Sequence, residues 1–92
     1  MFDWDDLKYL HALALHGSTL AAARALRVSA TTVQRRLQDL EQRIGEPLVR
    51  RETAGYQLTD FALELLPLTE RVAGAVQEVE QHVLTCRAAK GS

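Results

Sequence analysis

Several features of common protein classes are scarce or missing in this sequence of 92 residues. It contains a single cysteine, Cys86, so no disulfide can form within the chain, and we expect a reducing compartment. No apolar run approaches the length that crosses a membrane. Where a signal peptide would be basic, the N-terminus is acidic, with Asp3, Asp5 and Asp6. We therefore predict a cytoplasmic protein with no membrane partner.

The chain also lacks a net positive charge, which at first argues against nucleic-acid binding. Its formal charge is −1, but the charges are unevenly distributed. Residues 24–51 carry seven arginines against three acidic side chains, a local charge of +4, whereas the flanking segments sum to −2 and −3. Because salt screens phosphate attraction within about 10 Å, the local surface matters more than the total. Arginine is also the better ligand for phosphate and guanine.

No set of catalytic or metal-ligating residues stands out. The sequence has no paired carboxylates in a plausible pocket, no Ser-His-Asp set, no Gly-rich phosphate loop and no metal-ligand spacing. His82 and Cys86 lie four residues apart and would supply only half a metal site, so we favour a packing role for them. We expect no enzymatic activity, no metal, no cofactor and no small-molecule effector site in this chain.

The most informative stretch is 18–44, where two apolar-periodic segments are joined by a short break. The first, 20–26, is rich in alanine, as a helix that approaches a neighbour closely would be. The second, 30–44, follows Ser29, whose hydroxyl can cap a helix N-terminus. One face of this second helix is predicted to be buried, because apolar residues recur at spacings of three and four: Val33, Leu37, Leu40 and Ile44. Two helices with so short a connection predict a helix-turn-helix.

The opposite face of the second helix is polar and long-armed. It carries Thr31, Gln34, Arg35, Gln38 and Gln42. Gln and Arg can make bidentate contacts with base edges, so such a face suits the major groove of DNA. The alternative is an ordinary solvated helix face, and this helix alone does not decide between them.

The predicted neighbours complete a small domain. A first helix over residues 4–16 begins after Asp3, ends at Gly17 and buries a stripe with Leu7, Leu10 and Ala14. In the helix after it, Ala22, Ala23 and Leu26 are expected to face the third helix, with Ala25 beside them.

After the third helix, the sequence predicts a β-hairpin with a turn at residues 52–55 and a return strand at residues 56–58. A basic hairpin after a helix-turn-helix is a wing, whose arginines would lie along the DNA backbone or enter a minor groove.

A last helix is predicted from Thr59 to residue 88, with residues 89–92 as a frayed end and a kink at Pro67. At roughly 28 residues and about 42 Å, it exceeds what a domain this small can cover. Its apolar stripe therefore needs a partner, and we favour a second copy of the chain over the alternative that it folds back. The stripe consists of Leu65, Leu68, Val72, Val76, Val79 and Val83, continuing to Cys86.

Eight short stretches of this chain form a familiar series. They are Leu7-Lys8-Tyr9-Leu10, Gly17-Ser18, Ala22-Ala23-Arg24-Ala25-Leu26, Val28-Ser29, Arg35, Leu40-Glu41, Ile44-Gly45-Glu46-Pro47-Leu48-Val49-Arg50-Arg51 and Leu58-Thr59. With this series, residues 4–85 resemble the N-terminal winged helix-turn-helix and linker helix of LysR-type transcriptional regulators. The series is far more specific than any single motif.

The resemblance implies a mainly α fold: a winged helix-turn-helix with three helices and a small hairpin over residues 1–58, then a long linker and dimerisation helix. It implies sequence-specific binding of double-stranded DNA by a homodimer, or by a dimer of such dimers, in transcription regulation. Together with the basic hairpin, it predicts DNA contacts from Ser29, Ala30, Thr31, Thr32, Gln34, Arg35, Arg36, Arg50 and Arg51. The apolar stripe of the last helix would then be the dimer interface.

The sequence departs from the family pattern at several positions. The family commonly has Gln-Pro where Ala30-Thr31 stands, an aromatic residue at Thr19, Phe at Val49 and Gly at Ala62. Family regulators also carry a C-terminal effector-binding domain. We therefore expect either a DNA-binding fragment or a naturally short protein without a sensor. A module that binds proteins through its last helix remains the alternative function.

Overall fold

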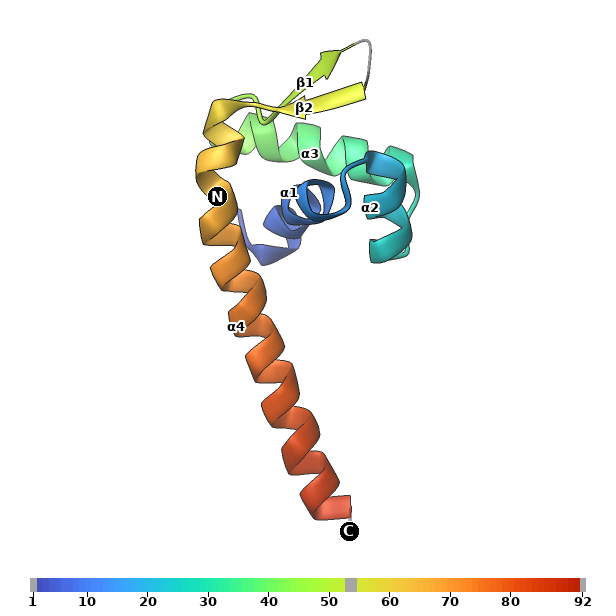
Figure 1. The fold of residues 1–92 in the computed structure, drawn as a ribbon, viewed down its shortest axis with the longest axis vertical. Coiled ribbons are helices and arrows are strands. Elements are labelled where there is room, and N and C mark those ends of the chain that lie inside the picture. The colour runs from blue at the N-terminus through green and yellow to red at the C-terminus, as the bar shows by residue number, and fades with distance from the viewer. Residues whose placement is uncertain (1, 53–54, 92) are drawn as a thin grey trace.

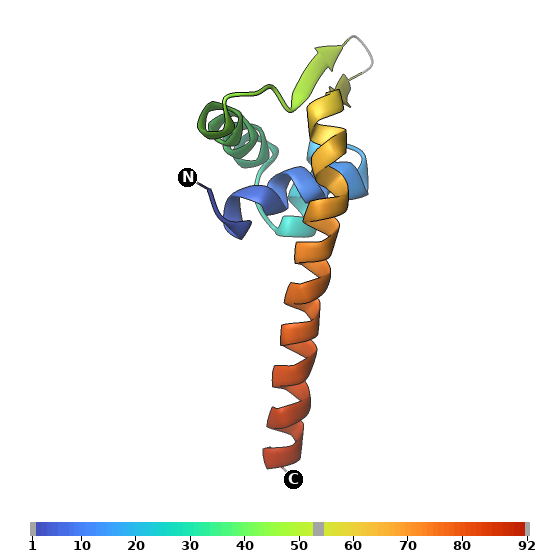
Figure 2. The ribbon, with the colours of Figure 1, turned by 90° about the vertical axis from the view of Figure 1, so that its left-hand side faces the viewer.

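The computed structural model describes residues 2–52 and 55–91 and has the expected winged helix-turn-helix architecture. The elements follow in the order α1 (Trp4–His16), α2 (Thr19–Leu26), α3 (Ala30–Ile44), β1 (Val49–Glu52), β2 (Gly55–Leu58) and α4 (Asp60–Gly91). Figure 1 shows the first three helices and the hairpin gathered around the start of α4, whose distal part extends away from them. The turned view in Figure 2 shows the same projection. The molecule measures 54 × 24 × 19 Å.

The helix ends lie where short-range capping signals place them. Asp3 accepts a hydrogen bond from the Asp6 N–H, and the Asp6 side chain accepts one from the Asp3 N–H, which forms a capping box. Ser18 and Ser29 cap α2 and α3 through their side chains. α2 ends at Arg27, which has a φ of 60° and is the only non-glycine residue with positive φ in the described chain. This left-handed conformation is strained in a residue with a Cβ.

The core forms where α1, α2 and α3 meet the first turns of α4. The buried face of α3 is confirmed: Val33, Leu37 and Leu40 are buried, and Ile44 packs against the core. In the stripe predicted for α1, Leu10 is buried and Leu7 packs against the core, whereas Ala14 is half-buried. The prediction missed Tyr9, Ala12 and Leu13, which are also buried. α1 contacts α2, α3 and α4, so it needs a wide apolar arc rather than one stripe.

α2 matches its prediction except at one position. Ala22 and Ala23 are buried, and Leu26 packs against the core. Ala25 is exposed, contrary to expectation. Its position on the helix turns it away from the buried pair. The packed face of α2 is therefore narrower than its alanine-rich composition suggested.

The wing is a two-stranded antiparallel sheet in which Val49 pairs with Leu58 and Arg51 pairs with Tyr56. The strands include residues 52 and 55, so the hairpin extends further than predicted, and the centre of the expected turn lies outside the described residues. Leu48, just before β1, is fully buried and attaches the wing to the core.

α4 is one continuous helix from Asp60 to Gly91. It continues through Pro67 without interruption and past residue 88, so the frayed end expected from residue 89 is not seen up to residue 91. The Thr59 hydroxyl accepts from the Ala62 N–H and donates to the Pro47 carbonyl, which fixes the start of the helix. Within the described residues, no helix combines the length and apolar character needed to cross a bilayer.

Candidate nucleic-acid interface

The N-terminal half of α3 carries the predicted base-reading residues in two different environments. Thr31 and Arg35 are exposed and Gln34 is half-buried at the outer edge, all away from the buried face. Ser29 and Thr32 are engaged with each other: the Ser29 Oγ accepts from the Thr32 N–H at 3.1 Å, and their two hydroxyls lie 2.9 Å apart. These two residues therefore form the helix cap. Ala30 packs against the core.

The arginines of α3 point to different sides. Arg35 is on the outer face, whereas Arg36 stacks near α1, with its guanidinium carbon 5.6 Å from the centroid of the Tyr9 ring. Arg43, which the sequence did not single out, donates to the Asp6 carboxylate at 2.8 Å. Of these three arginines, only Arg35 is directed outward without a partner from α1.

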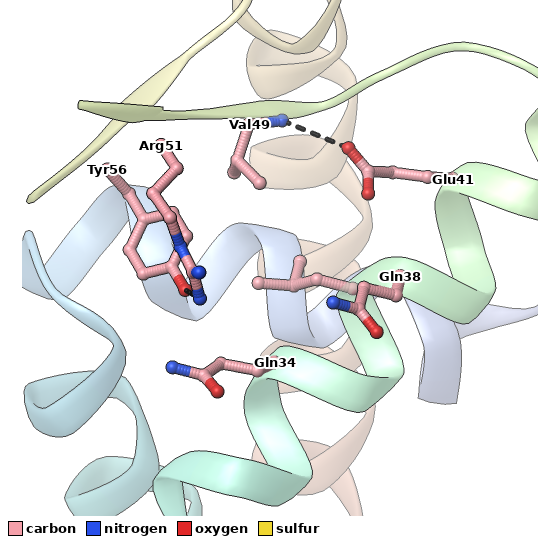
Figure 3. A pocket seen from close by; sticks show the side chains of 7 residues that line it. Gln34, Gln38, Glu41, Val49, Arg51 and Tyr56 are labelled. Carbon is pink, nitrogen blue, oxygen red and sulfur yellow. Dashed lines mark hydrogen bonds between the residues drawn. The ribbon is translucent and has the colours of Figure 1, made fainter.

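A cleft of about 210 Å³ separates α3 from the wing. Figure 3 shows Gln34 and Gln38 projecting into it from α3, and Arg51 and Tyr56 extending toward it from the hairpin. Arg51 Nη2 donates to the Tyr56 hydroxyl at 3.2 Å, and the guanidinium carbon lies 5.8 Å from the ring centroid. This hydrogen bond and the charge interaction with Tyr56 raise the pKa of Arg51 further above its usual value.

The two wing arginines lie on opposite faces of the hairpin. Adjacent residues of a strand point to opposite sides, so Arg51 and its cross-strand partner Tyr56 face α3, whereas Arg50 and its partner Gln57 face away. Both arginines are exposed. The sequence had presented them as one basic pair, but only Arg51 shares the cleft with the recognition helix.

Glu41 has a role that sequence reasoning missed. From α3 its Oε2 accepts hydrogen bonds from the Leu48 N–H at 2.6 Å and the Val49 N–H at 3.3 Å, as Figure 3 shows for Val49. The carboxylate thereby ties the first strand of the wing to the recognition helix. The sequence alone does not reveal this role, because it depends on a chain reversal that brings back residues seven and eight positions later.

The predicted interface stripe on α4 is mostly open. Leu65 packs against the core, Val76 is half-buried, and the exposed members are Leu68, Val72, Val79 and Val83. The distal stripe is therefore not covered by the chain's own domain, and the fold-back alternative was wrong. Leu84, which was not predicted, is also exposed.

Two further features accompany the α4 stripe. An apolar groove of about 320 Å³ runs beside its proximal half, lined by Phe2, Leu7, Ile44, Phe61, Leu65, Leu68, Thr69 and Val72. At the distal end, Cys86 Sγ lies 3.6 Å from His82 Nε2, and both side chains are exposed rather than packed. In the described part of the chain, no group of three or more His, Cys, Asp or Glu side chains could hold a metal ion.

With the fold and the geometry established, a family assignment follows from comparison. The model of the bacterial regulatory helix-turn-helix proteins of the LysR family matches residues 4–63. The chain belongs to the LysR family. The match spans α1, α2, α3 and the wing, so the helix-turn-helix lies within the region that the family model describes. The relatives it matches carry the names of transcriptional regulators and not of enzymes.

Two relatives of this LysR-family chain illustrate the similarity. The iron-regulated virulence regulatory protein IrgB of Vibrio cholerae is 34% identical over 90 residues, which cover 90% of this chain and 30% of that protein. The putative regulator PtxE of Stutzerimonas stutzeri is 44% identical over 61 residues, covering 66% and 31%. The chain thus spans about a third of the length of these relatives.

A solved structure extends the comparison to most of the chain. The DNA-binding domain of CbnR, crystallised in complex with DNA, matches with a TM-score of 0.76 and 28% identity, covering 92% of this chain and 98% of that one. The likeness therefore includes the wing and much of α4, and it supports the assignment of the fold.

Proposed function

We propose that this chain is a sequence-specific double-stranded DNA-binding module that works as a homodimer. The observation that carries the proposal is the arrangement of α3: its back is buried, Thr31, Gln34 and Arg35 lie away from that face, and Gln34 shares a cleft with the wing residue Arg51. In this proposal residues 1–58 bind DNA and α4 joins two copies. The crystallised complex of the CbnR domain with DNA supports it by analogy.

The DNA contacts divide by chemistry. Thr31, Gln34 and Arg35 would read base edges in the major groove, where Arg favours guanine and Gln favours adenine. Arg50 and Arg51 would contact phosphates, which adds affinity without sequence information. The remaining predicted positions lie at the cap and edges of α3 and would hold its N-terminal half in place for these contacts. They are Ser29, Ala30, Thr32 and Arg36.

The test begins with selection of bound duplexes from a random pool. Arg35→Ala is expected to cost about 1–3 kcal/mol of binding free energy and relax preference at one base position. Arg51→Ala should weaken all duplexes alike and reduce the slope of log affinity against log salt by about one. The matched control is Arg71→Ala, which removes an exposed arginine from α4. DNA affinity unchanged by both Arg35→Ala and Arg51→Ala would refute the proposal.

The homodimer part of the proposal is supported by the exposed apolar stripe of α4. Four large aliphatic side chains on one helix face are left in solvent, and an apolar groove lies beside them. Contiguous exposed apolar surface of this kind marks an interaction site. A second copy is the simplest occupant, because two such helices can pair their stripes along their length.

Charge placed in the stripe should separate the two copies. Replacing Val76 and Val79 together by Asp is expected to convert dimers to monomers in light scattering and to weaken binding to a two-half-site duplex, because each half-site is then bound independently. The control replaces Gln77 and Gln81 by Asp, which adds the same charge on the other side of α4. A Val76/Val79 variant that remained dimeric would exclude this interface, and a monomeric wild type would favour a different protein as the occupant.

A further inference from the structure

Tyr56 stands out as a polar aromatic residue that the DNA-binding assignment does not use. It is half-buried on β2, directly opposite Arg51 in the hairpin register. Its hydroxyl accepts one N–H of the Arg51 guanidinium, and its ring lies beneath the same group. An exposed arginine on a wing otherwise samples many conformations, so these two contacts restrict where the charge of Arg51 is held.

Arg51 is held on the face of the wing that is turned toward α3. The guanidinium lies at the cleft that Gln34 and Gln38 line from α3 (Figure 3). The acid in this cleft, Glu41, directs one carboxylate oxygen to two main-chain N–H groups of the wing. The cleft therefore holds N–H donors from Arg51, Gln34 and Gln38 beside one carboxylate, and the Arg51 guanidinium is the group in its lining that can attract an anion.

The cleft also lies where a DNA strand would pass. In the proposed binding mode α3 occupies a major groove and the wing lies beyond its edge, so a sugar-phosphate strand that borders the groove would pass close to the cleft between them. A guanidinium has five N–H donors, and Tyr56 occupies one, which leaves enough for a bidentate contact with a phosphodiester.

We propose that Tyr56 is a positioning residue for DNA binding, which holds Arg51 over the cleft between α3 and the wing so that it meets a backbone phosphate. The inference rests on the proposed DNA-binding function and adds to it a residue that acts through Arg51. Tyr56 itself carries no charge to release counterions, so its effect depends on Arg51 being present.

A double-mutant cycle tests this dependence. Wild type, Tyr56→Phe, Arg51→Ala and the double variant are titrated with two duplexes: one selected by the wild-type chain and one unrelated duplex of equal length. Tyr56→Phe keeps the ring and removes the hydroxyl, and it should weaken binding to both duplexes by roughly three- to tenfold. In the Arg51→Ala background the same change should have no effect. The salt slope of Tyr56→Phe should lie between those of wild type and Arg51→Ala.

Two controls separate positioning from a structural role. Gln57→Ala alters the other face of the same strand and should leave affinity unchanged. The melting temperature of Tyr56→Phe should match that of wild type. If Tyr56→Phe weakened binding equally with and without Arg51, Tyr56 would act on the shape of the wing and the inference would be overturned. Wild-type affinity in Tyr56→Phe would overturn it as well. Failure of the wild type to bind either duplex would instead remove the proposed function and this inference with it.

Discussion

Glu41 offers the sharpest test of how the wing is held against the recognition helix. Its carboxylate accepts a short hydrogen bond from the buried Leu48 N–H and a longer one from the Val49 N–H. Hydrogen bonds to a charged group each contribute about 1.5–3 kcal/mol, and the longer bond borders an open cleft where water can replace it. Glu41→Ala should therefore lower the free energy of unfolding by about 2–4 kcal/mol.

The measurement is urea unfolding followed by circular dichroism at one fixed protomer concentration, because dimer formation would otherwise change the apparent stability. For a domain of this size, each 1 kcal/mol lost from the free energy of unfolding lowers the melting temperature by roughly 4–8 °C. Glu41→Gln keeps a neutral acceptor at the same place and should lose less than Glu41→Ala.

Asp39→Ala is the matched control, since it removes an exposed carboxylate from the same helix. Removing negative charge near DNA should by itself raise affinity, so Asp39→Ala is expected to bind slightly more tightly. Glu41→Ala should bind more weakly than wild type despite the same charge change, because the wing loses its attachment. An unfolding free energy within about 0.5 kcal/mol of Asp39→Ala, or DNA binding as tight as that control, would refute this explanation.

The other predictions concern strain and charge in the helical core. Arg27→Gly should raise the free energy of unfolding by about 1 kcal/mol, because it relieves a left-handed conformation in a residue with a Cβ; no gain in thermal or urea unfolding would contradict this. Arg43→Ala should lower the free energy of unfolding by about 1–2 kcal/mol, because it leaves the buried Asp6 carboxylate without its charged partner. This value is smaller than for a fully buried pair, because the Arg43 side chain is 50% exposed and solvent screens the interaction. In the Asp6→Asn background the same change should cost less than half as much, and equal costs in both backgrounds would show that the pair is not coupled.

Features set by neighbouring residues were predictable from the sequence. The caps at Asp3 and Ser29 act over three residues, and the buried face of α3 follows from its spacing. The same is true of the basic middle segment and of the length of α4, which exceeds what the domain can cover. The prediction for α1 was incomplete, because three different helices pack against it and no periodicity within α1 indicates how many neighbours it has.

The remaining features depend on chain segments brought together by folding. Glu41 acquires its role only when the chain returns to place β1 beside α3, and Arg43 meets Asp6 across 37 positions of sequence. Arg50 and Arg51 are adjacent residues of the same type, and the sequence does not distinguish them. In the hairpin, Arg51 faces α3 and Arg50 faces away from it. Short-range hydrogen bonds and periodic burial depend on residues that are close in the sequence, so they can be predicted from it. The direction of a side chain relative to a distant element depends on packing, and it emerges only when the helices and the wing are assembled.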